Sequence, residues 1–180
     1  ICIVKNYLIH KTIGHLHHHS ARVLCMMFVI VSLCFAVGCV RDKDERLVIE
    51  RAESLLRNNP QEALSLMESI DRSTIHENSE LAYYALIYSE ACYYNRKLVD
   101  SDSLTSISVK YYNNRRDYDR RARAYFQHGM VMNLSKQYPE AIIALMESLK
   151  SIDYYGNLRL EGVVHRTMGD VYRARYCYNN

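Results

Sequence analysis

The chain contains the tetrapeptide Leu-Met-Glu-Ser at residues 66–69 and repeats it at residues 145–148. Both copies follow the same lead-in, a proline and then a small residue: Pro60 with Ala63, and Pro139 with Ala141. The copies begin 79 residues apart, which is two periods of about 40 residues. Periods of that size are typical of stacked helical hairpins, and such stacks serve mostly as docking surfaces. The repeat therefore predicts an all-α fold of antiparallel hairpins.

The formal charge of +3 belongs to the beginning of the chain. Residues 1–38 carry three basic residues (Lys5, Lys11 and Arg22) and no acid, whereas residues 39–180 hold 20 basic and 20 acidic residues. Nonspecific nucleic-acid binding needs a net positive surface. The neutral body therefore argues against a nucleic-acid partner.

The basic start leads into an apolar run, residues 23–39, whose length fits the hydrophobic region of an export signal. The run ends in Ala36-Val37-Gly38-Cys39, which resembles the lipobox of bacterial lipoproteins. That resemblance implies a cleaved signal segment over residues 1–38, a lipid on Cys39, and a short polar linker within residues 39–46. The alternative is an uncleaved transmembrane anchor, for which the run is marginal in length. In either case we expect a membrane-anchored protein of the cell envelope, with the outer or inner membrane left open.

Cysteine and histidine add no further site. Once the leader is removed and Cys39 is lipidated, only Cys92 and Cys177 remain, without the spacing of a disulfide framework or a zinc site. The histidine-rich stretch at residues 15–19 lies in the leader and would leave with it. We therefore expect neither a metal nor a cofactor.

After the linker, apolar residues recur at spacings of three and four, which predicts helices. The first break falls at Asn59-Pro60, where Asn59 can cap the next helix and Pro60 suits its first position. A long helix is predicted through Leu81–Ala91. A weaker pattern predicts its partner over Ser103–Tyr112, since Ser and Thr compete for the backbone.

The next hairpin carries the most specific pattern. Its first helix presents Tyr125, Gly129 and Met132, and its second helix, after a break at residues 137–139, presents Ala141, Leu145 and Ser148. This order of large and small residues resembles the tetratricopeptide repeat (TPR). The resemblance implies that Gly129 lets the paired helices approach closely and that Ala141 nests against the first helix.

A fourth unit opens with residues 165–172, in which Gly169 lies one repeat period after Gly129 and Tyr172 supplies a large aromatic side chain. The resemblance covers residues 47–180 and is strongest over residues 121–178. Together with the lipobox, it extends to lipid-anchored TPR proteins of Gram-negative cell envelopes. Because no second helix follows in the fourth unit, we expect repeats that are truncated at the C-terminus.

No catalytic motif stands out, and we expect that the protein is not an enzyme. Glu161, His165 and His128 could form an acid–base group. Both histidines, however, occupy positions where TPR helices pack, so we expect them in the core.

Arginines cluster over residues 115–123, interrupted by Asp117 and Asp119. The simplest interpretation is that these residues form the solvent-exposed start of a helix, where the arginines and aspartates pair with one another. The sharper alternative is that Arg116, Arg120 and Arg123 bind the carboxylate of a peptide. Tyrosine is abundant, with 16 residues and no Trp, and exposed tyrosines on a concave face would make good anchors.

The sequence thus predicts a right-handed α-solenoid of three complete hairpins and a partial fourth over residues 47–180. The expected function is non-catalytic protein–protein interaction by a membrane-anchored lipoprotein, through a groove formed mainly by the first helix of each hairpin. Two alternatives stay open. One is a TPR subunit of an outer-membrane assembly machine, and the other is the sensor arm of a longer regulator whose output domain lies beyond Asn180.

Overall fold

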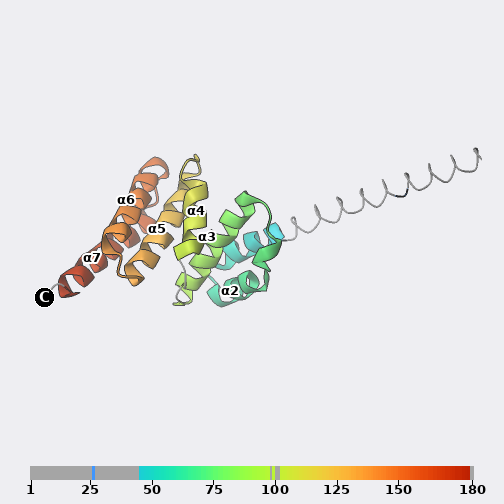
Figure 1. The fold of residues 1–180 in the computed structure, drawn as a ribbon, viewed down its shortest axis with the longest axis horizontal. Helices are drawn as coiled ribbons and strands as arrows, with labels where there is room; N and C mark the ends of the chain where they lie inside the picture. Colours follow the sequence, from blue (N-terminus) through green and yellow to red (C-terminus); the bar gives the residue numbers. More distant parts are fainter. Residues whose placement is uncertain (1–25, 27–44, 98, 100–101, 179–180) are drawn as a thin grey trace, which may run out of the picture. The chain divides into compact units, whose positions relative to one another are not determined.

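The computed structural model describes Met26, residues 45–97, residue 99 and residues 102–178, with the backbone alone at residues 177 and 178. The expected signal segment and Cys39 therefore lie outside the described residues, apart from Met26. Within the described part every regular element is a helix, so the all-α prediction is confirmed (Figure 1). None of these described helices is long and apolar enough to cross a bilayer.

Short connections join the successive helices. They are residues 45–55, α2 (Pro60–Ser69), the single turn η1 (Arg72–Thr74), α3 (Asn78–Tyr94), α4 (Asp102–Tyr112), α5 (Tyr118–Leu134), α6 (Tyr138–Tyr155) and α7 (Leu158–Tyr178). From α2 on, each α-helix packs on the next along the chain, and α3 also contacts α5 while α5 contacts α7. We call residues 45–55, α3, α5 and α7 the first helices, and α2, α4 and α6 the second helices.

The predicted break at Asn59-Pro60 is confirmed. Asn59 caps α2, where its side chain accepts a hydrogen bond from the Glu62 amide at 3.3 Å, and Pro60 is the first helical residue. Proline is tolerated there because the first amides of a helix have no partner within the helix. The chain therefore reverses at this point and returns along the helix formed by residues 45–55.

The turns after α3 and α5 have the same geometry and lie one repeat period apart. Arg96 and Lys136 both have positive φ, at 56° and 60°. Two hydrogen bonds close each turn. The amide of the positive-φ residue donates to the carbonyl three residues earlier (Arg96 to Tyr93 at 3.1 Å, Lys136 to Asn133 at 3.0 Å), and the following amide donates to the carbonyl five residues earlier (Lys97 to Cys92 and Gln137 to Met132, both at 2.9 Å). This is the Schellman arrangement, which satisfies the last carbonyls of a helix. The two hairpins thus repeat at the level of the backbone.

The same spacing recurs inside the hairpins. The Ser108 hydroxyl of α4 donates to the Ala82 carbonyl of α3 at 3.0 Å, and the Ser148 hydroxyl of α6 donates to the Ala122 carbonyl of α5 at 2.8 Å. Both serines are buried, so each hydroxyl needs its partner. A helical hairpin of about 40 residues is therefore the repeating unit of α3 to α6.

Gly129 lies where α5 and α6 approach each other. A Cβ atom at this position would lie 2.9 Å from Leu145 Cγ and 3.2 Å from the Ala141 carbonyl oxygen. Ala141 and Leu145 are fully buried, and Met132 is buried as well. Tyr125 is partly buried and donates to the Asn113 side chain at 2.8 Å. The absence of a side chain at Gly129 is thus what lets Leu145 pack directly on α5.

The fourth unit differs from the prediction. Its helix begins at Leu158, well before the expected opening at His165. Gly169 is exposed, and a Cβ added there would meet no atom within 4 Å, while Tyr172 is 45 % exposed. Neither of these two expected repeat-packing positions is therefore buried among the described residues. Both residues lie on the side of α7 that faces away from α5 and α6.

The buried side chains form two clusters along the helices. One joins residues 45–56 with α2, α3 and α4, through buried residues such as Ile49 and Met67. The other joins α5, α6 and α7, through residues such as Phe126 and Val164. Ala124 of α5 belongs to the first cluster. The contact between α3 and α5 therefore links the two clusters.

The two glycines one period apart should respond oppositely to leucine. Gly129→Leu should destabilise the protein by about 3 kcal/mol, because the side chain overlaps Leu145 and the α6 backbone. Gly129→Ala should cost about 1 kcal/mol, since the overlap exceeds the gain in helix propensity. Gly169→Leu should stabilise by about 0.5–1 kcal/mol. Urea unfolding of the three variants measures this, and equal losses for the two leucine variants would contradict it.

Candidate functional site

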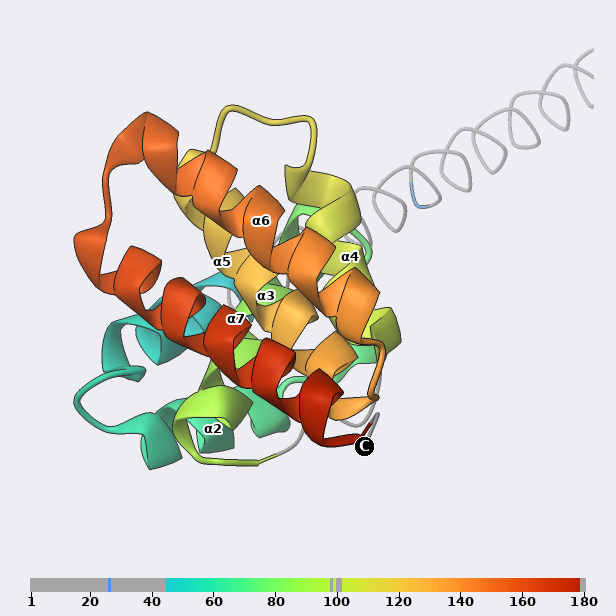
Figure 2. The same cartoon turned by 90° about the vertical axis from the view of Figure 1, so that its left-hand side faces the viewer.

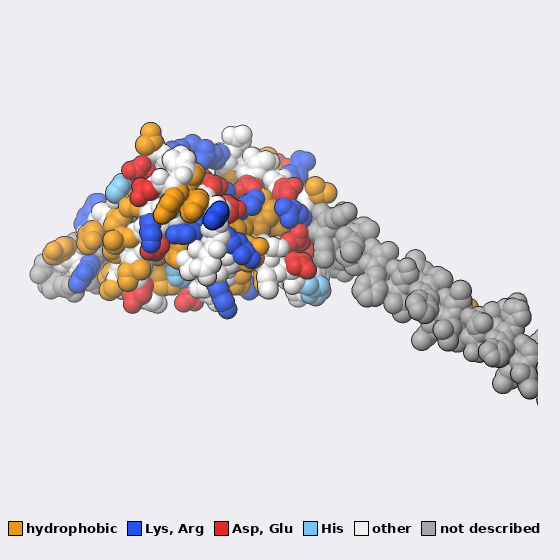
Figure 3. Space-filling model, turned by 90° about the horizontal axis from the view of Figure 1, so that it is seen from above, with side chains coloured by type: hydrophobic (Ala, Val, Ile, Leu, Met, Phe, Trp, Pro, Cys, Tyr) orange, Lys and Arg blue, Asp and Glu red, His pale blue; other side chains and the backbone are white. Residues whose placement is uncertain are grey.

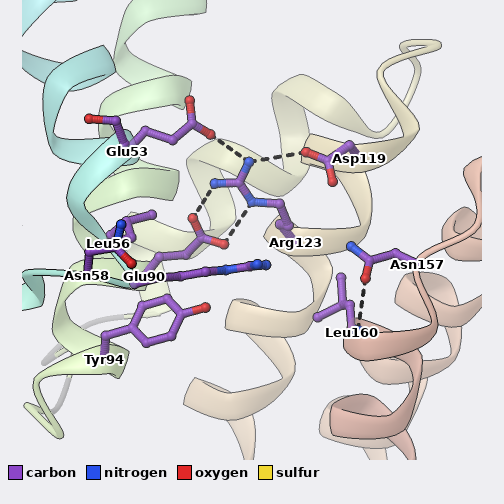
Figure 4. Close-up of a pocket in the computed structure, with 11 residues that line it drawn as sticks. Glu53, Leu56, Asn58, Glu90, Tyr94, Asp119, Arg123, Asn157 and Leu160 are labelled. Atoms are coloured by element: carbon purple, nitrogen blue, oxygen red, sulfur yellow. Dashed lines mark hydrogen bonds and ion pairs between the residues drawn. The ribbon is translucent and has the colours of Figure 1, made fainter.

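A cavity of about 360 Å³ opens on the first helices. Its walls come from the end of the 45–55 helix and the turn after it, from α3, from the start of α5, and from the start of α7. It is lined by Glu53, Ser54, Leu56, Arg57, Asn58, Glu90, Tyr94, Asp119, Arg123, Asn157 and Leu160. The cavity is therefore bordered by residues of the four first helices and of the turns next to them (Figure 4).

Arg123 is at the centre of the wall of this cavity. Its Nε donates to Glu90 Oε1 at 2.8 Å and its Nη2 donates to Glu90 Oε2, which gives a bidentate pair between α5 and α3. Its Nη1 donates to Glu53 Oε1 at 2.6 Å and to Asp119 Oδ2 at 3.1 Å. One guanidinium thus holds carboxylates from three helices, as Figure 4 shows. Such charge-assisted, forked hydrogen bonds are stronger and more directional than neutral ones.

A second layer of polar contacts holds Glu53 from the other side. The Tyr83 hydroxyl of α3 donates to Glu53 Oε2. The Arg120 guanidinium lies over the Tyr83 ring, 4.5 Å from its centre, and binds Asp117 at 3.2 Å. The Glu53 carboxylate is therefore fixed by α3 on one oxygen and by α5 on the other.

The network shifts the proton affinities of its members. Burial alone would raise the pKa of Glu53, but the Tyr83 hydrogen bond and the charge of Arg123 outweigh it and hold that pKa below its usual range. Burial and the Glu53 carboxylate raise the pKa of the Tyr83 hydroxyl. Burial opposes the charge on Arg123, yet Glu90 and Glu53 keep its pKa above the usual value. Glu53 and Arg123 therefore keep their charges at neutral pH.

The cavity carries more negative than positive groups. Three carboxylates (Glu53, Glu90 and Asp119) face the two guanidinium groups of Arg57 and Arg123, which leaves one negative charge. Asp119 is the most accessible of the three, with 46 % of its side chain exposed. Arg123 is 16 % exposed and already donates four hydrogen bonds. Arg123 therefore has little donor capacity left for a ligand, and Arg57 is the other cationic group of the lining.

Apolar contact is offered at the two ends of the cavity. Tyr94, at the end of α3, is 38 % exposed and packs edge-on against Tyr93 with ring centres 5.5 Å apart. Leu160 lies in the first turn of α7, where its amide donates to the Asn157 side chain at 3.1 Å. The ring and the leucine flank the charged centre, so the cavity can hold a side chain with an apolar stem and a polar end.

The arginines predicted to clamp a peptide carboxylate have partners within the protein. Arg123 is occupied by Glu53, Glu90 and Asp119, and Arg120 by Asp117 and the Tyr83 ring. Arg116 is exposed in the turn before α5 and does not line this cavity. The structure therefore does not bring the three arginines together as a clamp, because the protein's own acids already bind Arg120 and Arg123.

The histidines do not form an acid–base group. His128 is partly buried on α5, where its Nδ1 lies 2.9 Å from the Thr105 hydroxyl of α4, and burial lowers its pKa. His165 was expected in the core, but its side chain is 60 % exposed and lies 4.0 Å from Glu161 on the same helix. The prediction of a core residue is therefore wrong for His165, which lies on an outer face of α7.

Sequence reasoning missed the three carboxylates of the site. Glu90 carried the clearest signal, because it is the only acid between Leu81 and Tyr94, in an otherwise apolar helix. A carboxylate at such a position, here only 9 % exposed, needs a buried cationic partner. The spacing of 33 residues to Arg123 does not match the repeat period, so periodicity could not identify that partner.

Comparisons with known proteins do not identify a family for this chain. No family model, no curated protein and no solved structure matches the chain. Among the described residues no group of three or more His, Cys, Asp or Glu is arranged to hold a metal ion. The relationship to TPR proteins stays a prediction, and the function of the site rests on its own geometry.

Removal of the central guanidinium should destabilise the fold. Arg123→Met keeps most of the side-chain volume but leaves Glu90 and Glu53 facing each other without a cation. We expect a loss of about 2–4 kcal/mol, since breaking a buried pair leaves an uncompensated charge. Arg173→Met is the matched control, because its ion pair with Asp170 is exposed and should contribute about 0.5 kcal/mol or less. Urea unfolding at neutral pH compares them, and similar losses would contradict a central role for Arg123.

Proposed function

We propose that the protein is a non-catalytic protein–protein interaction module, built as a right-handed TPR-like α-solenoid and anchored to the cell envelope by a lipid on Cys39. The observation that carries the proposal is the cavity on the first helices, with its fixed charges and exposed aromatic ring. The lipobox-like sequence Ala36-Val37-Gly38-Cys39 supports the anchor. The two expected alternatives, an assembly subunit or a sensor arm, would use the same groove.

The repeat geometry supports a solenoid. Equivalent turns and serine hydrogen bonds recur after one period in the hairpins α3–α4 and α5–α6. The cap before α7 continues the pattern: the Asn157 side chain accepts from the Leu160 amide at 3.1 Å, as the Asp117 side chain accepts from the Arg120 amide at 3.1 Å. Stacking of such units places the first helices along one face. A continuous face of this kind suits an extended peptide or a partner helix.

The chemistry of the cavity indicates what kind of partner it suits. The lining holds three carboxylates against two guanidinium groups, so its net charge is negative, and Asp119 is the most exposed of the carboxylates. A lysine or arginine side chain fits this site, because its stem can contact Tyr94 and Leu160 while its charged end meets Asp119 and Glu90. The ion cluster fixes these acceptors before binding, which lowers the entropic cost of association. The proposed partner segment therefore carries an accessible basic residue.

Tyr94 provides the test of the groove. Short random peptides selected on the full chain should be enriched in Lys or Arg, and Tyr94→Ala should weaken the selected peptides by about tenfold, as the loss of an aromatic anchor does. Asp119→Asn should weaken them as well. Ser106→Leu, a change at an exposed position of α4, is the control and should leave affinity unchanged. Isothermal titration measures these affinities. Acidic selected peptides, or equal binding to all variants, would refute the proposal.

Cys39 provides the test of the anchor. Cys39→Ser should abolish incorporation of radioactive palmitate and move the protein from the membrane to the soluble fraction, because the sulfur is the proposed attachment point. Cys92→Ser is the control, since Cys92 is buried in α3 and should not affect labelling. Undiminished labelling of Cys39→Ser would exclude the lipobox. Loss of labelling with retained membrane association would instead favour the uncleaved transmembrane anchor.

A further inference from the structure

A second cavity, of about 230 Å³, is lined by the C-terminal halves of α3 and α5 and by the turn after α3. Figure 2 shows α3 behind α5, and the two helices are in contact. The second cavity shares no lining residue with the cavity around Arg123. Its volume is below the range of about 300–1,000 Å³ that is typical of pockets for whole small molecules. It therefore suits a single side chain.

Most of the lining of the second cavity is apolar. Val131 is buried, Tyr93 and Met130 are partly buried, and Leu134 is exposed. The Tyr93 ring packs edge-on against Phe126, with ring centres 5.5 Å apart, so its orientation is fixed by α5. A tyrosine ring and a methionine thioether both make favourable contacts with an aromatic ring. The lining therefore favours an aromatic occupant over an aliphatic one.

One polar side chain of this lining has no partner. Gln127 is only 5 % exposed, yet its side-chain amide makes no hydrogen bond with any residue that the structure describes. The buried Ser89 hydroxyl, also in the lining, donates to the Ala85 carbonyl at 2.6 Å, so only its lone pairs remain for a ligand. A purely apolar occupant would leave the Gln127 amide unpaired and away from water, which is unfavourable. The occupant must therefore bring a polar group.

The charges of the second cavity disfavour a basic occupant. Its lining holds Arg96 and Lys97 and no acid, whereas basic and acidic side chains are interspersed on the face of the molecule drawn in Figure 3. Lys97 binds Glu68 of α2 at 2.6 Å, but Arg96 forms no ion pair with a described residue. A lysine or arginine side chain would be repelled by Arg96, while the face of an aromatic ring would be attracted.

We propose that the second cavity binds the phenol ring of a tyrosine side chain. Tyrosine combines an aromatic body with a hydroxyl that both donates and accepts, whereas phenylalanine has no polar group and the tryptophan indole only donates. The ring contacts Tyr93 and Met130, and its hydroxyl forms a hydrogen bond with the Gln127 amide. The tyrosine belongs to the partner segment whose basic residue enters the first cavity, so in this respect the site rests on the proposed function.

The probes are p-cresol, which is the tyrosine side chain alone, and toluene, which lacks only the hydroxyl. The full chain is titrated with each, and the methyl NMR signal of Met130 reports occupancy. p-Cresol should bind about tenfold more tightly than toluene, and Gln127→Leu should reverse this preference. Ser106→Leu is the control and should bind both probes like the unchanged protein. An unchanged preference for p-cresol in Gln127→Leu would overturn the proposal.

Urea unfolding tests whether the Gln127 amide is free to bind a ligand. Gln127→Leu should not lower the stability of the protein, because the side chain loses no hydrogen bond to a described residue. A clear loss of stability would show that the amide has a partner within the protein, and this would also overturn the proposal.

Blocked amino acids test whether the phenol comes from a polypeptide. N-acetyl-tyrosine amide should displace p-cresol, and N-acetyl-lysine amide should not. Failure of the tyrosine derivative would overturn the proposal in favour of a free small phenol. Asp119→Asn, which should weaken basic peptides at the first cavity, should leave the affinity for p-cresol unchanged. Weaker p-cresol binding in that variant would place the probe in the first cavity and overturn the proposal, whereas failure of the basic-peptide test alone refutes only the function proposed for the first cavity.

Discussion

The Arg123 guanidinium is the contact on which the arrangement of the first helices depends. It joins Glu53, Glu90 and Asp119, and its partner Glu53 lies 70 residues away along the chain. Stacked hairpins otherwise contact mainly their neighbours, so few side chains can connect three of them. The planar fork of arginine makes this feasible, because several N–H groups point in fixed directions. Lysine, a single point of charge, could not hold the bidentate Glu90 and Glu53 together.

The same contact determines what the cavity offers to a ligand. Because Arg123 is bound by the protein's own acids, the positive charge that the sequence displays at this position is not available. The acids, by contrast, keep lone pairs that face the cavity, and Asp119 is still half accessible. The side chains that form the ion network are thus also part of the cavity lining. The charge that the cavity presents to a ligand depends on which groups are already paired within the protein. Residues 115–123 of the sequence hold five arginines and two acids, yet the lining of the cavity carries a net negative charge.

The sequence allowed the fold to be predicted where local chemistry decides it. Asn59 and Pro60 indicate a helix start, and Gly129 indicates a close approach, because the alternatives at these positions are sterically or energetically poor. Residue type and period alone do not determine the environment of Gly169. Gly129 and Gly169 are identical in type and one period apart, but only Gly129 has a helix packed on it among the described residues. Glu90 shows the other limit, since its need for a cation is visible in the sequence and the identity of that cation is not.

The repeat separates structural positions from functional ones. The turn residues Arg96 and Lys136, and the serine hydrogen bonds of α4 and α6, recur at the repeat period because each hairpin must be closed and packed in the same way. The charged residues of the Arg123 network do not recur: the position one period before Arg123 is Tyr83, and the position one period after Glu90 is Met130. A charged residue without an equivalent one period away does not contribute to the packing that all the hairpins share. The Arg123 network is a specific contact between different first helices, and the proposed binding cavity lies at this contact rather than at a position that the repeat would supply.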